Sequence, residues 1–257
     1  MTAKVALESE TTFDQLVKSL TDKLTDDIQK AWSIFCWVGS QKINEGNTNK
    51  TPAEGTPLWY SLNKEPSEYP KLITIMMRKA KLPCVTIRGK AKTSNYEAGD
   101  ESVDGESQWN AVFVSGSWRL LHPQWAFQSI VGLQKPGWIK FEDDGEKTRE
   151  EVAGSEGQIV STRETFYFLA DPEDFIHFCR PPDDQKGWQL IKPSLSKDRY
   201  IKLPFIRPQY AKSNAKFSFR RGQINTIEAK KGECELAIQV NNSKWRGQLS
   251  YSLLVYS

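Results

Sequence analysis

The feature that most constrains the fold is a hairpin pattern between Ser107 and Trp125. Two runs of alternating, β-prone residues flank the pair Ser115 and Gly116. Such a pair between two such runs is the short-range signature of a β-hairpin with a two-residue loop. The sequence therefore predicts two antiparallel strands here, in a register that pairs Val114 with Ser117.

This register has a consequence at the open end of the hairpin. It pairs Trp109 with His122 and places Ser107 diagonally opposite His122 on one face, roughly 7–8 Å away. That spacing can bring the two members of an acid–base pair together at a strand end. A serine and a histidine, however, are not the residues that such a pair requires.

The run Trp-Asn-Ala-Val, a glycine turn and then Trp-x-Leu-Leu-x-Pro-x-Trp resembles the core of transglutaminase-like domains. In that family a histidine stands two residues before Trp-Asn, and an aspartate stands directly before Pro-x-Trp. The resemblance places these positions at Ser107 and His122. It places the cysteine nucleophile at a helix start, three residues before a tyrosine, which here gives Pro66 and Tyr69. All three catalytic positions are substituted, so the family's activity does not carry over.

Three alternatives remain for a displaced catalytic residue. If the alignment shifts by one residue, Ser67 takes the nucleophile position, but a serine still needs a base, and Ser107 cannot be one. Cys36 is a candidate nucleophile, although its large apolar neighbours favour a packing role. His122 is a candidate base, although the third member of a triad contacts the base and not the nucleophile.

The resemblance also implies a vestigial cleft beside the three substituted positions. Its lining is predicted to comprise Ser67, Tyr69, Gln108, Trp109 and Trp125.

The composition is that of a soluble globular protein. Of the 257 residues, 38% are hydrophobic and 26% are charged, and the formal net charge is +3. No dense Lys/Arg run is interleaved with aromatic residues, so we expect no nucleic acid partner. No apolar window is long enough to span a membrane, and no charged-then-apolar leader is present, so we expect neither a membrane span nor a signal peptide.

The cysteine pattern argues against a metal site. Cys36, Cys84, Cys179 and Cys234 lie far apart and form no CxxC motif, whereas metal and redox motifs usually need close spacing. We therefore predict reduced thiols in a cytoplasmic protein, with no metal and no cofactor.

Three amphipathic helices are predicted in the N-terminal part. The first begins at Thr12, which forms a capping box with Gln15. The second begins near Asp26, and the third has Ser67 as its N-cap and Pro70 at its third position. Their apolar faces follow helical spacing. The three stripes are Phe13, Leu16, Val17, Leu20 and Leu24; then Ile28, Trp32, Phe35 and Val38; then Leu72, Ile73, Met76, Met77 and Ala80.

A strand is predicted at Cys84–Gly89, followed by a polar, acidic stretch at Thr93–Glu106. That stretch is either a solvated surface loop or a lid beside the former cleft. After Trp125 the chain runs through glycine and proline breaks and a charged stretch at Phe141–Glu151, where we assign no element.

The next helix starts at Asp171, with Pro172 at its first position. His177 and Cys179 are placed in this helical segment. A Cys/His catalytic pair is conceivable there, but two residues apart on a helix the side chains point away from each other. We therefore favour a packing role for both.

From Ala215 onward the pattern alternates, and glycines mark turns. The pattern indicates an antiparallel β unit of four strands. These are Phe217–Phe219, Ile224–Ile227, Leu236–Val240 and Leu249–Val255. The last strand runs to the end of the sequence, which fits a chain that is a fragment and a sheet that belongs to a larger Ig-like sandwich.

The predicted fold class is α+β, a papain-like transglutaminase core with helices packed on an antiparallel sheet, followed by a β-rich segment. The predicted domains are 1–160 for the core, 161–210 for a connector with a short helix, and 211–257 for the antiparallel β segment. The run from Phe166 to Ile176, together with Trp188-Gln189-Leu190 and Leu203-Pro204-Phe205, resembles the segment after the core in the kyphoscoliosis peptidase and hillarin group, and this similarity extends from about Asp26 to about Tyr210.

Because all three catalytic positions are substituted, we expect a catalytically inactive domain that binds protein partners, and the resemblance implies a cytoskeleton-associated scaffold. The alternative is an active transglutaminase or a cysteine- or serine-type peptidase that uses displaced residues. A small-molecule binder that uses the vestigial cleft is the least favoured reading.

Overall fold

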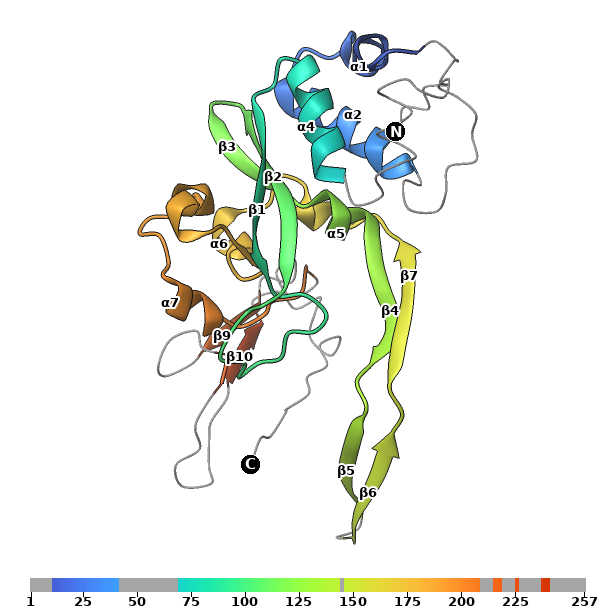
Figure 1. Ribbon diagram of the computed structural model, residues 1–257, viewed down its shortest axis with the longest axis vertical. Coiled ribbons are helices and arrows are strands. Elements are labelled where there is room, and N and C mark those ends of the chain that lie inside the picture. Colours follow the sequence, from blue (N-terminus) through green and yellow to red (C-terminus); the bar gives the residue numbers. More distant parts are fainter. Residues whose placement is uncertain are drawn as a thin grey trace. The chain divides into compact units, whose positions relative to one another are not determined.

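The computed structural model describes residues 11–41, 69–143, 146–208, 215–218, 225–226 and 237–240 (Figure 1). The chain forms two compact units, each built from two separate stretches of sequence. The first contains residues 1–80 and 122–168, and the second contains residues 81–121 and 169–257. Within the described ranges, no helix combines the length and the apolar character that crossing a bilayer requires.

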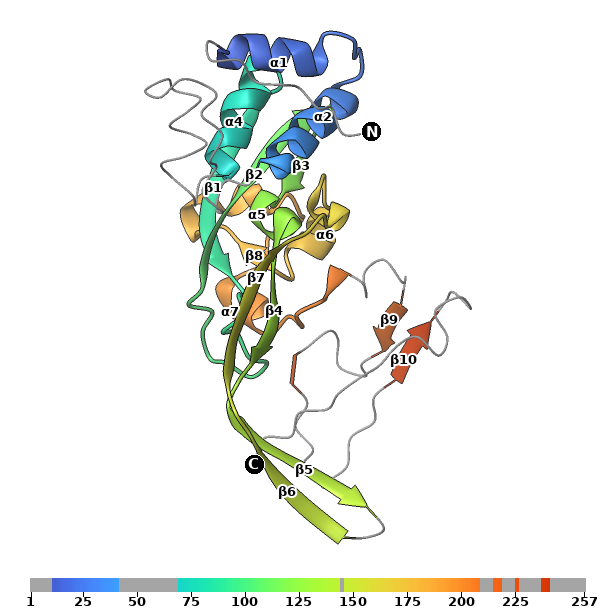
Figure 2. The same ribbon diagram turned by 90° about the vertical axis from the view of Figure 1, so that its right-hand side faces the viewer.

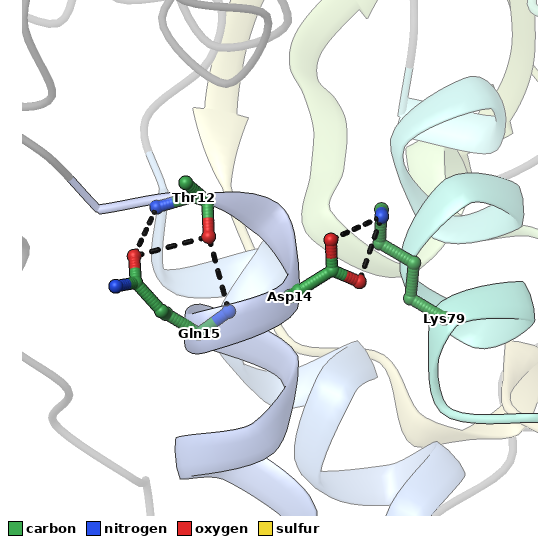
Figure 3. Close-up of polar contacts among 4 residues, drawn as sticks. All are labelled: Thr12, Asp14, Gln15 and Lys79. Atoms are coloured by element: carbon green, nitrogen blue, oxygen red, sulfur yellow. Dashed lines mark hydrogen bonds and ion pairs between the residues drawn. The ribbon is translucent and has the colours of Figure 1, made fainter.

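The first unit begins with α1 (Phe13–Thr21), and its predicted capping box is confirmed. The Thr12 hydroxyl accepts a hydrogen bond from the Gln15 N–H at 3.3 Å, and the Gln15 side chain accepts one from the Thr12 N–H at 2.8 Å (Figure 3). The Asp14 carboxylate lies 2.7 Å from Lys79 Nζ, and the same view shows this ion pair. Leu24 lies beyond the end of the helix and is only half-buried, so the predicted stripe is one residue too long.

The second helix, α2 (Asp27–Ser40), starts after the predicted N-cap Asp26, whose carboxylate accepts a backbone N–H of the first turn at 2.9 Å. The prediction for Ile28 is wrong, because this side chain is 39% exposed. The buried face is centred on Ala31, Ile34 and Val38. At 3.6 residues per turn, Ile28 lies roughly a quarter turn away from the centre of that face.

The third described helix, α4 (Tyr69–Lys79), carries Pro70 in its first turn, as predicted. Its predicted N-cap Ser67 lies outside the described residues. The buried side chains include four of the predicted stripe: Leu72, Ile73, Met76 and Met77. Together α1, α2 and α4 form the helical layer of this unit (Figure 1).

The rest of the first unit contains strands that the sequence analysis missed. After α5 (Pro123–Phe127) come β4 (Gln128–Gln134), β5 (Gly137–Asp143), β6 (Glu146–Val152), β7 (Ser155–Ser161) and then the 3₁₀ turn η1 (Thr165–Tyr167). β4 pairs with β7 and β5 pairs with β6, both antiparallel. Figures 1 and 2 show them as one long two-stranded ribbon. The described side chains of β4 and β7 are exposed or half-buried, so no apolar/polar alternation marks a core-facing side in the sequence.

The second unit is built on a four-stranded sheet with the order β3-β2-β1-β8. Its strands are β1 (Cys84–Ala91), β2 (Glu106–Val114), β3 (Ser117–Leu121) and β8 (Cys179–Arg180), and all neighbours are antiparallel. The predicted strand at Cys84–Gly89 is therefore confirmed. Residues 93–105 form no helix or strand, as expected for the acidic stretch.

The predicted hairpin is confirmed at its turn and differs at its open end. Val114 pairs with Ser117. Ser115 and Gly116 have positive φ angles of 48° and 78°, as a two-residue type I′ loop requires. The ladder ends one pair earlier than predicted, at Asn110 and Leu121, so the expected pair of Trp109 with His122 is wrong.

The segment after the sheet corrects the prediction for His177 and Cys179. Asp171 caps α6 (Pro172–Phe175) as predicted, but this helix has only 4 residues. His177 lies beyond its end and Cys179 begins β8, so the two residues share no helix. The 3₁₀ turn η2 (Asp183–Gln189) and α7 (Lys197–Ile201) follow.

Only parts of the C-terminal β unit are described. β9 (Ala215–Ser218) pairs antiparallel with β10 (Ala237–Val240), close to two of the four predicted strands. Asn225 and Thr226 form neither helix nor strand, so the predicted strand at Ile224–Ile227 is wrong at these two positions. The predicted strand at Leu249–Val255 lies outside the described residues.

The predicted fold class is confirmed: the molecule combines helices with an antiparallel sheet, as a transglutaminase-like core does. The Ig-like sandwich and the domain boundaries 1–160, 161–210 and 211–257 stay predictions.

Candidate functional site

The most informative site residue is His122, which lies directly after β3 and forms the N-cap of α5. Its side chain is fully buried. The ring stacks on Trp125 with 4.2 Å between the ring centres and 18° between the planes. The His122 N–H donates to the Tyr167 carbonyl oxygen at 3.0 Å. The backbone and the ring of His122 are thus both fixed by residues of the first unit.

The hydrogen bonds of His122 settle its protonation state. Nδ1 accepts the Trp125 N–H at 3.3 Å, and an accepting nitrogen must be unprotonated, so the neutral ring carries its proton on Nε2. Burial lowers the pKa of His122 to about 3, against a smaller opposing effect of a backbone hydrogen bond. At neutral pH this imidazole is uncharged and serves as a helix cap.

Near the predicted nucleophile position, the structure describes Tyr69. Pro66 and the alternative Ser67 lie outside the described residues. Tyr69, the family's marker tyrosine, is the first residue of α4 as the resemblance expects, and it is only 4% exposed. Its ring lies 5.4 Å from the ring of Phe127 at the end of α5. Tyr69 therefore packs in the core of the first unit.

The predicted cleft residues of β2 lie in the second unit. Ser107 and Gln108 are half-buried and pair with Gly89 and Arg88 of β1. Trp109 is fully buried, and its ring lies 5.9 Å from the ring of Phe175. Trp109 is thus a core residue of the second unit.

The structure brings the predicted site residues together in two groups. His122, Trp125 and Tyr69 belong to the first unit, and Ser107, Gln108 and Trp109 belong to the second. The meeting of Pro66, Ser107 and His122 at one place stays a prediction, as does the vestigial cleft.

No cysteine in the described ranges resembles an activated nucleophile. Cys36, Cys84 and Cys179 form no disulfide. Burial raises the pKa of the half-buried Cys36, although Arg163 opposes the effect, and burial raises the pKa of Cys179 well above its usual value. A catalytic thiolate needs a lowered pKa. Among the described residues, no three His, Cys, Asp or Glu side chains gather as a metal site would require.

The contacts of the remaining candidate pair, His177 and Cys179, indicate packing roles. His177 directs Nδ1 to the Pro204 carbonyl oxygen at 2.8 Å. Cys179 is a fully buried strand residue. Neither is placed as a nucleophile–base pair would be.

The sequence analysis assigned no role to two buried residues, Tyr167 and Lys92. Tyr167 packs against His122 and Trp125, with ring-centre distances of 6.1 and 5.7 Å. Lys92 is only 1% exposed, although lysines are almost never fully buried. The position of Tyr167 in an aromatic run could have indicated packing, but no sequence signal marks Lys92.

Comparison with known proteins places the chain among longer relatives. It is 28% identical over 218 residues to hillarin of Drosophila melanogaster, a match that covers 83% of this chain and 25% of hillarin. It is 26% identical over 232 residues to the LIM and transglutaminase domain protein ltd-1 of Caenorhabditis elegans, covering 89% of this chain and 30% of that protein. No family model matches the chain.

A third relative is the kyphoscoliosis peptidase of Mus musculus, 27% identical over 216 residues, which covers 77% of this chain and 27% of that protein. The chain therefore spans 25–30% of the length of these three relatives. With its α+β fold and its Trp-Asn-Ala-Val hairpin, the chain is similar to the transglutaminase-like group that includes hillarin and kyphoscoliosis peptidase.

Proposed function

We propose that the chain is a catalytically inactive transglutaminase-like domain that acts by binding other proteins. The observation that carries the proposal is the state of His122. In the family the position before Pro-x-Trp orients the catalytic histidine with a carboxylate. Here it holds an uncharged ring whose Nδ1 already accepts a backbone N–H. Such a ring offers no negative charge to stabilise an imidazolium.

The substitutions at Pro66 and Ser107 support the same proposal. Proline has no nucleophilic side chain, and a serine hydroxyl is no base for a thiol or hydroxyl. The described thiols have raised pKa values or are buried, so none of them replaces the missing nucleophile. A thiol whose pKa is not lowered is largely protonated at neutral pH and is therefore a weak nucleophile.

The exposed apolar side chains of the ribbon support a role in protein binding. On β4 and β7, Ile130 is 46% exposed and Ile159 is 70% exposed. Ile130 and Ile159 are direct cross-strand partners and share one face. Grouped apolar side chains on a surface often mark an interaction site. A cytoskeletal partner is the proposal that follows from the hillarin and kyphoscoliosis peptidase resemblance.

The first experiment tests the loss of activity. The wild-type chain is treated with an iodoacetamide probe, and amine incorporation into a glutamine-bearing protein is measured with calcium present, beside an active transglutaminase. We expect no thiol that reacts ahead of the others and no incorporation. Turnover that Cys36→Ser, Ser67→Ala or His122→Asn abolishes would establish the alternative, an enzyme with displaced residues.

A second experiment tests the assignment of the three positions. The triple variant Pro66→Cys, Ser107→His, His122→Asp restores the family's residues, and Pro66→Cys alone is its control. If the three positions meet, the new thiol of the triple variant reacts with iodoacetamide at pH 6 at least about tenfold faster than in the control, because a paired thiol has a lowered pKa. Equal rates would show that the positions are misassigned.

A third experiment tests binding. The chain is used as bait in a tissue extract, and co-sedimentation with actin filaments is measured directly. Ile159→Lys places a charge on the apolar face, and Gln158→Lys places the same charge on the opposite face of the same strand. We expect the first variant to lose captured proteins that the second retains. Equal capture by both variants would show that the apolar face of the ribbon does not bind these proteins.

A further inference from the structure

The carboxyl end of α7 in the second unit is held by an unusual set of donors. The last carbonyl groups of a helix lack partners within the helix. Here four successive carbonyl oxygens, from Ile201 to Pro204, accept hydrogen bonds from other segments. Asn225 donates to the first two, through Nδ2 at 3.0 Å and through its backbone N–H at 2.8 Å.

The other two carbonyl groups are bound by basic side chains. Lys92, which directly follows β1, donates from Nζ to the Leu203 carbonyl oxygen. His177, which lies between α6 and β8, has Nδ1 2.8 Å from the Pro204 carbonyl oxygen and donates to it. Three segments far apart in the sequence thus converge on one short stretch of backbone, and we call Lys92, His177 and Asn225 the clasp.

The surroundings of Lys92 are aromatic. Nζ lies 4.8 Å from the ring centre of Tyr96 and 5.1 Å from that of Tyr200. The Tyr200 hydroxyl donates to the Phe178 carbonyl oxygen at 2.8 Å, and the Tyr96 hydroxyl accepts from Asn225 Nδ2 at 2.8 Å. Ring faces attract an ammonium group but supply no negative charge.

The two basic members of the clasp, Lys92 and His177, have no carboxylate beside them in the described part of the chain. Tyr96 and Tyr200 face Lys92, the charge of Lys92 acts on His177, and the further groups that act on Tyr200 are Cys179 and Arg180. Arg180 pairs with its own carboxylate, Asp183, and no carboxylate in the described part of the chain lies within ion-pair distance of Lys92 or His177. The side chains of Lys92 and His177 are 1% and 6% exposed. Two buried positive charges here would repel each other without a counter-charge.

We propose that the clasp is a proton-sensitive fastener that holds the chain after α7 against the β1–β8 part of the sheet, and that it loosens as its two bases become protonated. The closed form fixes the backbone of residues 201–204, from which the chain leads into the C-terminal β segment. Opening of the clasp would release the backbone of residues 201–204 without disturbing the pairing of β1 with β2. The device does not depend on whether the chain is an enzyme.

The direction of the pH effect follows from burial. Burial lowers the pKa of Lys92 to about 7. Burial and the charge of Lys92 also lower the pKa of His177, whereas the hydrogen bond to the Pro204 carbonyl oxygen raises it. In the open form both groups return toward their ordinary values, so opening takes up protons and is favoured as the pH falls. For Lys92 alone, going from pH 8 to pH 5.5 multiplies the open-to-closed ratio by about ten.

The test is amide hydrogen exchange on the wild-type chain at pH 8 and pH 5.5, corrected for the chemical exchange rate. The reporters are the Leu203 and Asn225 amides, which donate to the Tyr200 and Lys202 carbonyl oxygens. We expect their opening to rise at least about tenfold at pH 5.5 relative to the amides of β1 and β2, since His177 adds to the effect of Lys92. An unchanged ratio overturns the proposal, and so does an equal rise in all these amides, which would mean global unfolding.

Variants identify the groups responsible. Lys92→Met keeps the length of an apolar side chain without a titrating amine, and His177→Gln keeps a donor without a titrating ring. We expect the combined variant to lose the pH dependence, and the exposed control Lys90→Met to retain the tenfold change. A combined variant that folds and keeps the full change overturns the assignment to these two bases. If it does not fold, His177→Gln alone must reduce the change, and the wild-type measurement stands by itself.

Discussion

Protonation of His122 should be a main cause of acid destabilisation of the first unit. Its folded-state pKa of about 3 lies below its ordinary value of 6.5, so between these two pH values the unfolded chain binds more protons than the folded one. Stability is therefore fully present above pH 6.5 and falls as the pH decreases toward 3. Each pKa unit corresponds to about 1.4 kcal/mol, which gives an upper bound of about 5 kcal/mol.

The variant His122→Asn isolates this effect. Asparagine can still cap α5 with a side-chain oxygen, but it does not titrate and it loses the stacking on Trp125. An aromatic pair contributes about 1 kcal/mol beyond burial, so we expect the variant to be less stable than the wild type at pH 7.5. Because the wild type loses about 1.4 kcal/mol per pH unit below pH 6.5, the two stabilities should become equal between about pH 5.5 and pH 6.

The assay is urea unfolding followed by tryptophan fluorescence at pH 7.5, 6.5, 5.5 and 4.5. Gln124→Ala, a half-buried neighbour on α5 that does not titrate, is the control and should shift all four curves equally. Parallel pH profiles of wild type and His122→Asn would refute the reasoning, because they would show that His122 binds its proton equally well in the folded and unfolded chains.

Three further predictions concern the helical layer and are checked by urea unfolding at neutral pH. Thr12→Ala removes the capping box and should cost about 1 kcal/mol, whereas Thr12→Ser should restore most of it; equal stabilities would contradict the cap. Met76→Ala removes a fully buried side chain and should cost about 2–5 kcal/mol, against less than about 0.5 for the exposed Arg78→Ala. Gly39→Ala drives a methyl group into the Phe127 ring and should cost about 1–3 kcal/mol, which the added substitution Phe127→Leu should partly relieve; a neutral Gly39→Ala would show that the ring moves freely.

The sequence predicted best those features that depend on neighbouring residues alone. The Thr12 and Asp26 caps, the Asp171–Pro172 helix start and the Ser115–Gly116 turn each occur where predicted, because a cap or a two-residue loop is decided within four residues. The α+β class follows in the same way from the spacing of apolar residues.

Predictions failed where the deciding partner is distant in the sequence. Helical spacing alone placed Ile28 in the core, but the packing of α2 against other helices chose a different face. The described side chains of β4 and β7 form no core-facing side, so no alternation of apolar and polar residues marks these two strands in the sequence. His177 and Cys179 were placed on a helix that ends at Phe175.

By itself, the sequence determined the caps, the hairpin turn and the fold class, whereas the loss of the family's catalytic residues at positions 66, 107 and 122 stays a prediction. Only the tertiary structure decided that His122 is an uncharged, fully buried helix cap and that Lys92 is buried between two tyrosine rings. The physical reason is that a side chain's charge state depends on desolvation and on hydrogen-bond partners. Those partners are brought together by the packing of segments up to 111 residues apart.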